Sequence, residues 1–279
     1  MSGRGPSKAT RAIESALGSV AELWHDPDGD AYADVRGEDG VRRTIRVRTR
    51  AFRTWLAGIF YAAEATALGG QAATDAVDQL AAMAIHGGPE REVHVRIAGG
   101  THGDVYLDLG DDDWKAVRIT PTGWSVVDEP PVRFRRPRGL RPLPQPTRGG
   151  QLSEFRSLLN LADDRDWVLV VSWMVGALRA QGPYPVLAPT GEAGSAKSTL
   201  GKVLRYIIDP NFAPLRGPPR DGRDLVVTAS NSHVVAFDNL SSLREWLSDA
   251  LCRVATGEGF STRQLYSDRE EALFAGARP

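Results

Sequence analysis

The stretch GEAGSAKSTL at residues 191–200 decides the fold class of this chain of 279 residues. A phosphate-binding loop reads Gly, any four residues, then Gly-Lys-Ser or Gly-Lys-Thr. Here Gly191 opens the pattern and Lys197-Ser198 close it, but Ala196 stands where the second glycine belongs. The apolar run YPVLAPT at 184–190 predicts a strand before the loop, and a helix is predicted after it, from about 197 to 208. Strand, glycine-rich loop and helix are the setting that such a loop requires.

A phosphate-binding loop works through its backbone, because successive N–H groups form a concave nest and the next helix adds partial positive charge. We therefore expect ATP and Mg²⁺ as cofactors. Lys197 would contact the β- and γ-phosphates, and Ser198 would bind Mg²⁺. Alanine at position 196 costs nothing if the backbone there is helical. The expected nucleotide-binding residues are Gly191, Glu192, Ala193, Gly194, Ser195, Ala196, Lys197, Ser198 and Thr199.

A second element of this site is the apolar run HVVAFDNLS at 233–241, which predicts a core strand ending in Asp238. In phosphate-loop NTPases a carboxylate in this position serves the magnesium ion, so we expect Asp238 to be a metal ligand. A compatible alternative is that Asp238 or Asn239 caps the helix predicted at 241–255.

The rest of the chain predicts a small α+β domain in front of this core. We expect a flexible N-terminus at 1–20, an α+β domain of unknown role at 21–130, a linker at 131–150 and the ATP-binding core at 151–279. In the second region, alternating or β-branched segments predict strands, the last four of which form an antiparallel sheet. These segments are 43–49, 91–99, 104–110, 114–120 and 123–128, and helices are predicted at 50–65, 73–85, 151–160 and 166–180.

The linker is rich in proline and arginine, and two interpretations of it stay open. It can be a solvated hinge, because proline lacks an N–H donor and favours extended backbone. It can also place arginines against phosphates. These arginines are Arg133, Arg135, Arg136, Arg138 and Arg141.

The bulk properties favour a cytoplasmic protein. The formal net charge is −1, so nucleic-acid binding would need a local basic patch or a ring of subunits. Cys252 is the only cysteine, which fits a reducing compartment. The apolar run at 167–178 is shorter than the roughly 20 residues of a membrane span, so we expect a buried helix and no membrane association.

The C-terminal segment resembles the part of superfamily 3 helicases that follows the second Walker motif, as found in poxvirus-type and satellite-phage-type primase-helicases. Residues 256–259 (TGEG) match the turn after a helix. Arg263, Leu265 and Tyr266 match the outgoing arm of a β-hairpin, and 273–274 match its return arm. The resemblance implies that this hairpin grips DNA in a ring pore, which makes Arg263 the DNA-contact candidate.

Residues 183–279 are also similar to ATP-binding proteins of bacterial prophages and integrative elements, which carry a GEQGSAKST loop. Alanine before the lysine therefore resembles a family trait. The resemblance implies an α/β fold with an incomplete AAA+-like P-loop NTPase core, assembled as a homo-oligomeric ring. It further implies an ATPase or helicase that moves single-stranded DNA during element replication, with Lys197, Asp238 and Asn239 as catalytic residues.

Three departures leave the enzymatic activity open. Asn239 follows Asp238 where these helicases usually have a second acidic residue, the hairpin has no lysine, and the chain ends at Pro279. The family's sensor residue and trans-acting arginine come later, so we expect a truncated core. Two alternatives remain. One is a P-loop small-molecule kinase, with 216–223 as its arginine-rich lid, and the other is a non-catalytic ATP-binding interaction protein.

Overall fold

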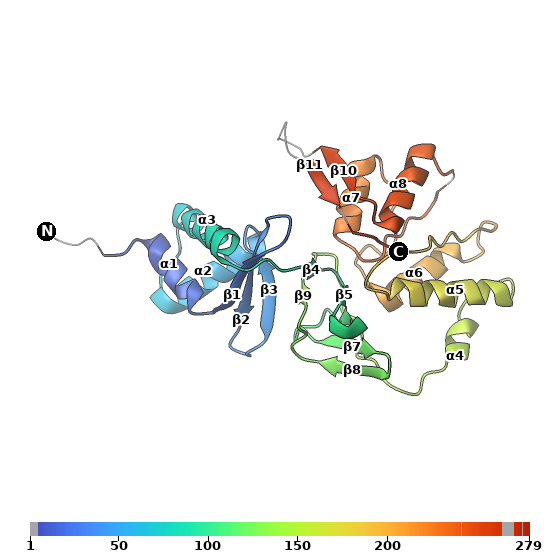
Figure 1. Cartoon of the computed structure of the whole chain (residues 1–279), viewed down its shortest axis with the longest axis horizontal. Coiled ribbons are helices and arrows are strands. Elements are labelled where there is room, and N and C mark those ends of the chain that lie inside the picture. The colour runs from blue at the N-terminus through green and yellow to red at the C-terminus, as the bar shows by residue number, and fades with distance from the viewer. Residues whose placement is uncertain (1–4, 241, 264–270, 275) are drawn as a thin grey trace. The chain divides into compact units, whose positions relative to one another are not determined.

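The computed structural model describes residues 5–240, 242–263, 271–274 and 276–279 (Figure 1). The chain forms two compact units. Unit 1 comprises residues 1–94 and 129–135, and unit 2 comprises residues 95–128 and 136–279. Both contain helices and strands, so the fold is mixed α/β.

Unit 1 packs three helices with a three-stranded antiparallel sheet in the order β1-β2-β3. Its core joins Phe52, Leu56 and Phe60 on one helix to Leu80 on another and Val35 on the central strand. The elements are α1 (Lys8–Leu17), β1 (Val20–His25), β2 (Ala31–Arg36), β3 (Arg42–Arg46), α2 (Arg50–Glu64), α3 (Gly70–Gly87), and β4 (Val93–His94), which pairs in parallel with β9 (Arg133–Phe134). The helices predicted at 50–65 and 73–85 are confirmed as α2 and α3.

The expectation of a flexible N-terminus is wrong for residues 8–17, which form α1. The Ser7 side chain caps this helix by accepting a hydrogen bond from the Thr10 N–H. Ala12 and Ala16 are fully buried in the core of unit 1. Small side chains on the inner face let the helix approach its neighbours closely, and composition alone gave no sign of this packing.

Unit 2 begins with a four-stranded antiparallel sheet in the order β5-β6-β7-β8, which confirms the predicted sheet. Its strands are β5 (Ile97–Gly99), β6 (Val105–Asp108), β7 (Ala116–Thr120) and β8 (Gly123–Val127), with a short 3-10 helix, η1 (Thr101–Gly103), after β5. The sheet does not group with the N-terminal helices, as the predicted domain at 21–130 would require. Ile97 instead shares a hydrophobic cluster with Trp173 and Leu204 of the C-terminal helices.

The C-terminal part of unit 2 consists mainly of helices. They are α4 (Leu152–Ser157), α5 (Asp164–Ala177), α6 (Lys197–Ile208), α7 (Gly222–Ser230) and α8 (Glu245–Thr256), followed by a hairpin of β10 (Phe260–Arg263) and β11 (Glu271–Phe274). The helix predicted at 197–208 is confirmed with the same bounds. The turn and hairpin expected after residue 256 are confirmed as well, since α8 ends at Thr256 and the two strands pair in antiparallel register.

The two core strands expected on either side of this helix are not formed. Between Arg136 and Leu240, a stretch that the structure describes throughout, no residue belongs to a named strand. The segments at 184–190 and 233–238 make isolated backbone contacts outside any named strand instead. Tyr184 N–H donates to the Ala255 carbonyl at 2.8 Å, and Phe237 forms an isolated parallel bridge with Arg216. An apolar run becomes a strand only where a neighbouring backbone continues the ladder. The P-loop core therefore stays a prediction.

The proline- and arginine-rich segment is not a solvated hinge between residues 133 and 136. Arg133 pairs with Asp34, and Arg136 pairs with Asp108 at 2.6 Å, while both carboxylates are almost fully buried. The Arg136 guanidinium also lies 4.0 Å from the ring centroid of Trp114. Because buried carboxylates need a charged partner, these two arginines are held in the fold and are not free for phosphates.

Helix α5 differs from the buried helix that its apolar sequence predicts. It buries Val170, Trp173 and Ala177, but Val168 and Val175 on its other side are more than half exposed. Among the described residues no helix is both long and apolar enough to cross a membrane.

Candidate nucleotide-binding site

The loop at 191–196 requires glycine at two positions. Gly191 has φ 151° and Gly194 has φ 81°, both in the region that side chains rarely adopt. A Cβ atom on Gly191 would also lie 2.9 Å from Ser195 Oγ. The glycines therefore permit a tight turn that ends at the first residue of α6, with Glu192 and Ala193 exposed in the loop.

Ala196 is the residue that departs from the sequence pattern, and its backbone is not helical. It has φ 65° and ψ 20°, which is left-handed, and it occupies the N-cap position of α6. An L-residue in this conformation costs about 1–2 kcal/mol. Alanine would cost nothing here only if the backbone were helical, and it is not. The methyl group therefore leaves local strain in the loop.

Lys197 folds back over the loop. Its ammonium group donates to the carbonyl oxygens of Gly191 at 2.8 Å and Glu192 at 2.6 Å, and to Ser195 Oγ at 3.2 Å. Asn160 supports the same loop from outside, since its Nδ2 donates to the Ser195 carbonyl at 3.3 Å. The positive charge of the lysine is thereby held at the N-terminal end of α6, where the helix dipole also favours an anion.

Ser198 and Asp238 meet although 40 residues separate them. Ser198 Oγ donates to Asp238 Oδ1 at 3.0 Å, and both residues are half-buried. The backbone of Asp238 is held by its N–H bond to the Arg216 carbonyl at 2.8 Å. Asn239 adopts φ 59° and donates its N–H to the same carboxylate oxygen. The alternative role as a helix cap is wrong, because Arg244 is the N-cap residue of α8.

A buried charge network joins the two halves of this site. Asp209 follows directly after α6, and its carboxylate pairs with Arg96 at 3.1 Å and Arg205 at 3.4 Å. Its Oδ2 atom accepts the N–H groups of His233 and Val234 at 2.9 and 3.1 Å. Asp209 thus ties the end of α6 to the start of the segment that carries Asp238. Sequence reasoning missed this residue, since a lone aspartate after a helix resembles an ordinary capping residue.

The pKa values of Asp209 and His233 are both lowered, for different reasons. Burial alone would raise the pKa of the Asp209 carboxyl, but the charges of Arg205 and Arg96 outweigh it and lower that pKa. Burial lowers the pKa of His233 to about 4. His233 is therefore neutral at pH 7, where its Nε2–H donates to the Ala177 carbonyl at 2.7 Å.

The hairpin that carries Arg263 is formed, but the structure does not connect it with the phosphate loop. Arg263 ends β10, and its backbone lies opposite Glu271 on β11. Leu265 and Tyr266 lie outside the described residues, as does the side chain of Arg263. The DNA contact at Arg263 therefore stays a prediction.

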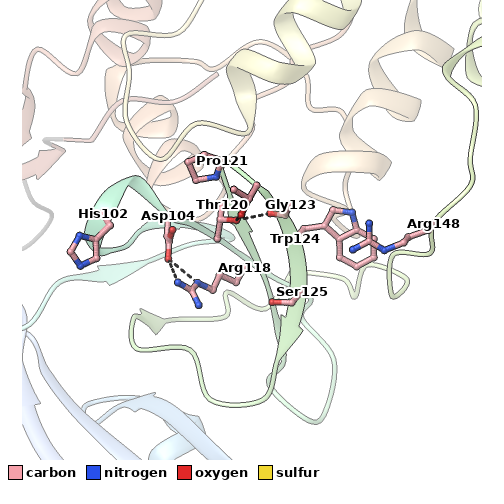
Figure 2. Close-up of a pocket in the computed structure, with 10 residues that line it drawn as sticks. His102, Asp104, Arg118, Thr120, Pro121, Gly123, Trp124, Ser125 and Arg148 are labelled. Carbon is pink, nitrogen blue, oxygen red and sulfur yellow. Dashed lines mark hydrogen bonds and ion pairs between the residues drawn. The ribbon is translucent and has the colours of Figure 1, made fainter.

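A second concave site lies on the four-stranded sheet, apart from the phosphate loop. It encloses about 580 Å³ and contains no residue of the predicted nucleotide site. Figure 2 shows its two arginines: Arg118 pairs with Asp104 at 2.6 Å, and the Arg148 guanidinium lies 4.9 Å from the ring centroid of Trp124. The carboxylate of Asp104 offsets part of the positive charge, so the pocket is a weaker anion site than the loop.

Comparison with known proteins finds a similarity in the C-terminal part of the chain. Residues 152–279 match the model of a family described as actinomycete integrative conjugative element replication proteins. This range contains Lys197, Ser198 and Asp238. The match supports a replication protein of a mobile element, in agreement with the resemblance to proteins of integrative elements. No curated protein matches the chain.

Proposed function

We propose that the chain binds ATP with Mg²⁺ and couples its hydrolysis to the movement of single-stranded DNA during replication of a mobile element, as a homo-oligomeric ring. One observation carries this proposal: the 3.0 Å hydrogen bond between Ser198 Oγ and Asp238 Oδ1. A hydroxyl that follows the loop lysine and a carboxylate from a distant segment are the two protein groups that hold Mg²⁺ in phosphate-loop NTPases.

The residues present fit the cofactor. Mg²⁺ is commonly bound by one or two protein oxygens together with phosphates and waters, which matches Ser198 and Asp238. Gly191 and Gly194 allow backbone N–H groups to approach phosphate oxygens, and Lys197 supplies a positive charge beside them. When bound, ATP would supply the phosphoanhydride bond whose cleavage provides the free energy for movement.

A non-catalytic ATP-binding protein is the second candidate, and Asn239 favours it. A carboxamide cannot accept a proton from the attacking water, so the usual acidic residue after Asp238 is replaced by a poor base. The kinase alternative finds less support. Arg216, at the start of the expected lid, has its backbone bonded to Ala236 and Asp238, and α7 begins at Gly222. The two ends of the lid segment are therefore held, by backbone pairing at Arg216 and by α7 from Gly222.

The test is binding of a fluorescent ATP analogue to the full chain, with and without Mg²⁺. Lys197→Ala should abolish binding, because the loop loses its only side-chain cation. Lys202→Ala is the matched control, since Lys202 is an exposed lysine on the same helix, and it should bind the analogue normally. Unchanged affinity in Lys197→Ala would remove the central claim.

Phosphate release separates the two candidate functions. Release that single-stranded DNA stimulates, and that Asp238→Asn abolishes, supports the coupled ATPase. Tight binding without release, with DNA present and the chain fully assembled, supports the non-catalytic protein.

A further inference from the structure

A groove of about 430 Å³ lies along the C-terminal half of α6, the helix that begins at Lys197. One wall is formed by α6 and the turn after it, and the other by residues 141–142. The lining residues are Arg141, Pro142, Lys202, Val203, Arg205, Tyr206, Pro210, Asn211 and Pro214. None of them belongs to the nucleotide site.

The groove is positively charged. Arg141 and Lys202 are exposed along it, and no acidic residue is among its lining residues. The third cation, Arg205, is buried and neutralised by Asp209. In a chain with a net charge of −1, this is a local concentration of free positive charge. Such a concentration favours a polyanion over an ordinary protein surface.

Two aromatic rings are exposed here: Tyr206 lines the groove, and Phe212 directly follows the lining residue Asn211. Tyr206 is 65% exposed and Phe212 is 75% exposed, although both are large and largely apolar. The Arg141 guanidinium lies 5.3 Å from the ring centroid of Phe212. Rings interleaved with cations are the arrangement on which single-stranded nucleic acids stack their bases and place their phosphates.

The outer wall of the groove is held firmly. Arg141 N–H donates to the Pro210 carbonyl at 2.9 Å, and Phe212 N–H donates to the Gly139 carbonyl at 2.8 Å. Leu140 and Asn211 form an antiparallel bridge between these bonds. Arg141 and Phe212 are therefore presented by a paired backbone, and Lys202 and Tyr206 by α6. This order lowers the entropy lost when a ligand binds.

We propose that this groove binds single-stranded DNA. Tyr206 and Phe212 stack against bases, while Lys202 and Arg141 contact phosphates. Tyr206 lies nine residues after Lys197 on α6, which is about 14 Å along the helix axis. A rigid helix thus connects the groove directly to the nucleotide loop. The groove adds a DNA contact separate from Arg263 to the proposed function. DNA binding in the groove does not require ATP binding, and only the coupling between the two rests on the proposed function.

The experiment measures binding of a fluorescein-labelled oligo(dT) to the full chain by anisotropy at several salt concentrations. Tyr206→Ala and Phe212→Ala should each weaken binding by about 5- to 150-fold, the range for loss of one stacked base. Lys202→Ala should lower the salt-dependence slope by about 0.7, as expected for one phosphate contact on a single strand. Tyr61→Ala and Arg165→Ala are matched controls: Tyr61 is an exposed tyrosine of unit 1, and Arg165 an exposed arginine of α5.

The fluorescent ATP analogue is measured on the same variants. Weaker oligo(dT) binding with normal ATP affinity supports the groove, whether or not ATP is hydrolysed. Unchanged oligo(dT) binding in Tyr206→Ala, Phe212→Ala and Lys202→Ala overturns the proposal and leaves the ATP result untouched. Equal weakening in the control variants also overturns it. If Tyr206→Ala instead dissociates an oligomer in sedimentation while DNA affinity is unchanged, the groove is an interface between copies of the chain.

Discussion

Replacing Asp209 by Asn tests whether the buried charge network holds unit 2 together. The substitution keeps the size of the side chain, so it leaves no cavity and removes only the negative charge. The side chains of Asp209, Arg96 and Arg205 are at most 3% exposed, so bulk solvent screens their charges only weakly. We expect a large loss of stability in unit 2.

The magnitude follows from the contacts. The carboxylate serves two guanidinium groups and two backbone N–H groups, those of His233 and Val234, all of which are donors. The carboxamide of asparagine has only one acceptor oxygen. Its NH₂ group is itself a donor and must therefore face some of these four donor groups without forming a hydrogen bond. Breaking a buried ion pair by removing one partner costs about 3–5 kcal/mol. A domain is stable by about 5–15 kcal/mol, so the loss is a large fraction of the total.

The assay is unfolding in urea, which leaves ion pairs unscreened, followed by tryptophan fluorescence. Trp173 lies in the hydrophobic core of unit 2 and reports on it. Asp113→Asn is the control, because Asp113 also pairs with a cation, Lys115, but is largely exposed. We expect no measurable shift in its midpoint, since exposed pairs contribute little.

A loss below about 1 kcal/mol in Asp209→Asn would refute the reasoning, because a network of this burial cannot lose its only anion so cheaply. The double variant with Arg96→Met gives a second check. Removing the guanidinium that Asp209→Asn leaves without a counter-ion should restore part of the lost stability. If the losses in free energy of unfolding of the two single variants simply add in the double variant, Asp209 and Arg96 do not interact directly.

Two further predictions concern the same unit. Ala196→Gly should raise the free energy of unfolding of unit 2, measured in urea, by up to about 1 kcal/mol. The backbone strain released by removing the left-handed alanine exceeds the extra entropy that glycine gives to the unfolded chain. A destabilised variant would contradict the strain argument. The free energy of unfolding of unit 2 should fall by about 2 kcal/mol between pH 7 and pH 5. In the unfolded chain, His233 takes up a proton below its ordinary pKa of 6.5. In the folded chain its pKa is lowered to about 4, so it stays neutral over this range. His233→Gln should reduce this pH dependence, and an identical pH profile would show that other groups cause it.

Local sequence patterns predicted several elements correctly. The helix at 197–208, the helices of unit 1 with long apolar side chains, and the antiparallel sheet of unit 2 all have a periodicity that one element expresses by itself. Helix α1 was missed because its buried face is made of alanines, which do not distinguish a packed helix from a flexible tail. The strands at 184–190 and 233–238 were predicted wrongly because a strand needs a partner, and sequence alone cannot supply it.

The candidate site also has features that the sequence predicts and features that only the tertiary structure shows. The sequence by itself determined the loop chemistry: glycines at 191 and 194, the lysine, the hydroxyl of Ser198 and a carboxylate some 40 residues later. Only the tertiary structure decided that Ser198 and Asp238 are in contact, that Ala196 is left-handed, and that Asp209 holds both segments in place. The physical reason is that residue types and short spacings set local backbone preferences. Contacts between distant segments depend on which buried charges and apolar faces the whole unit brings together.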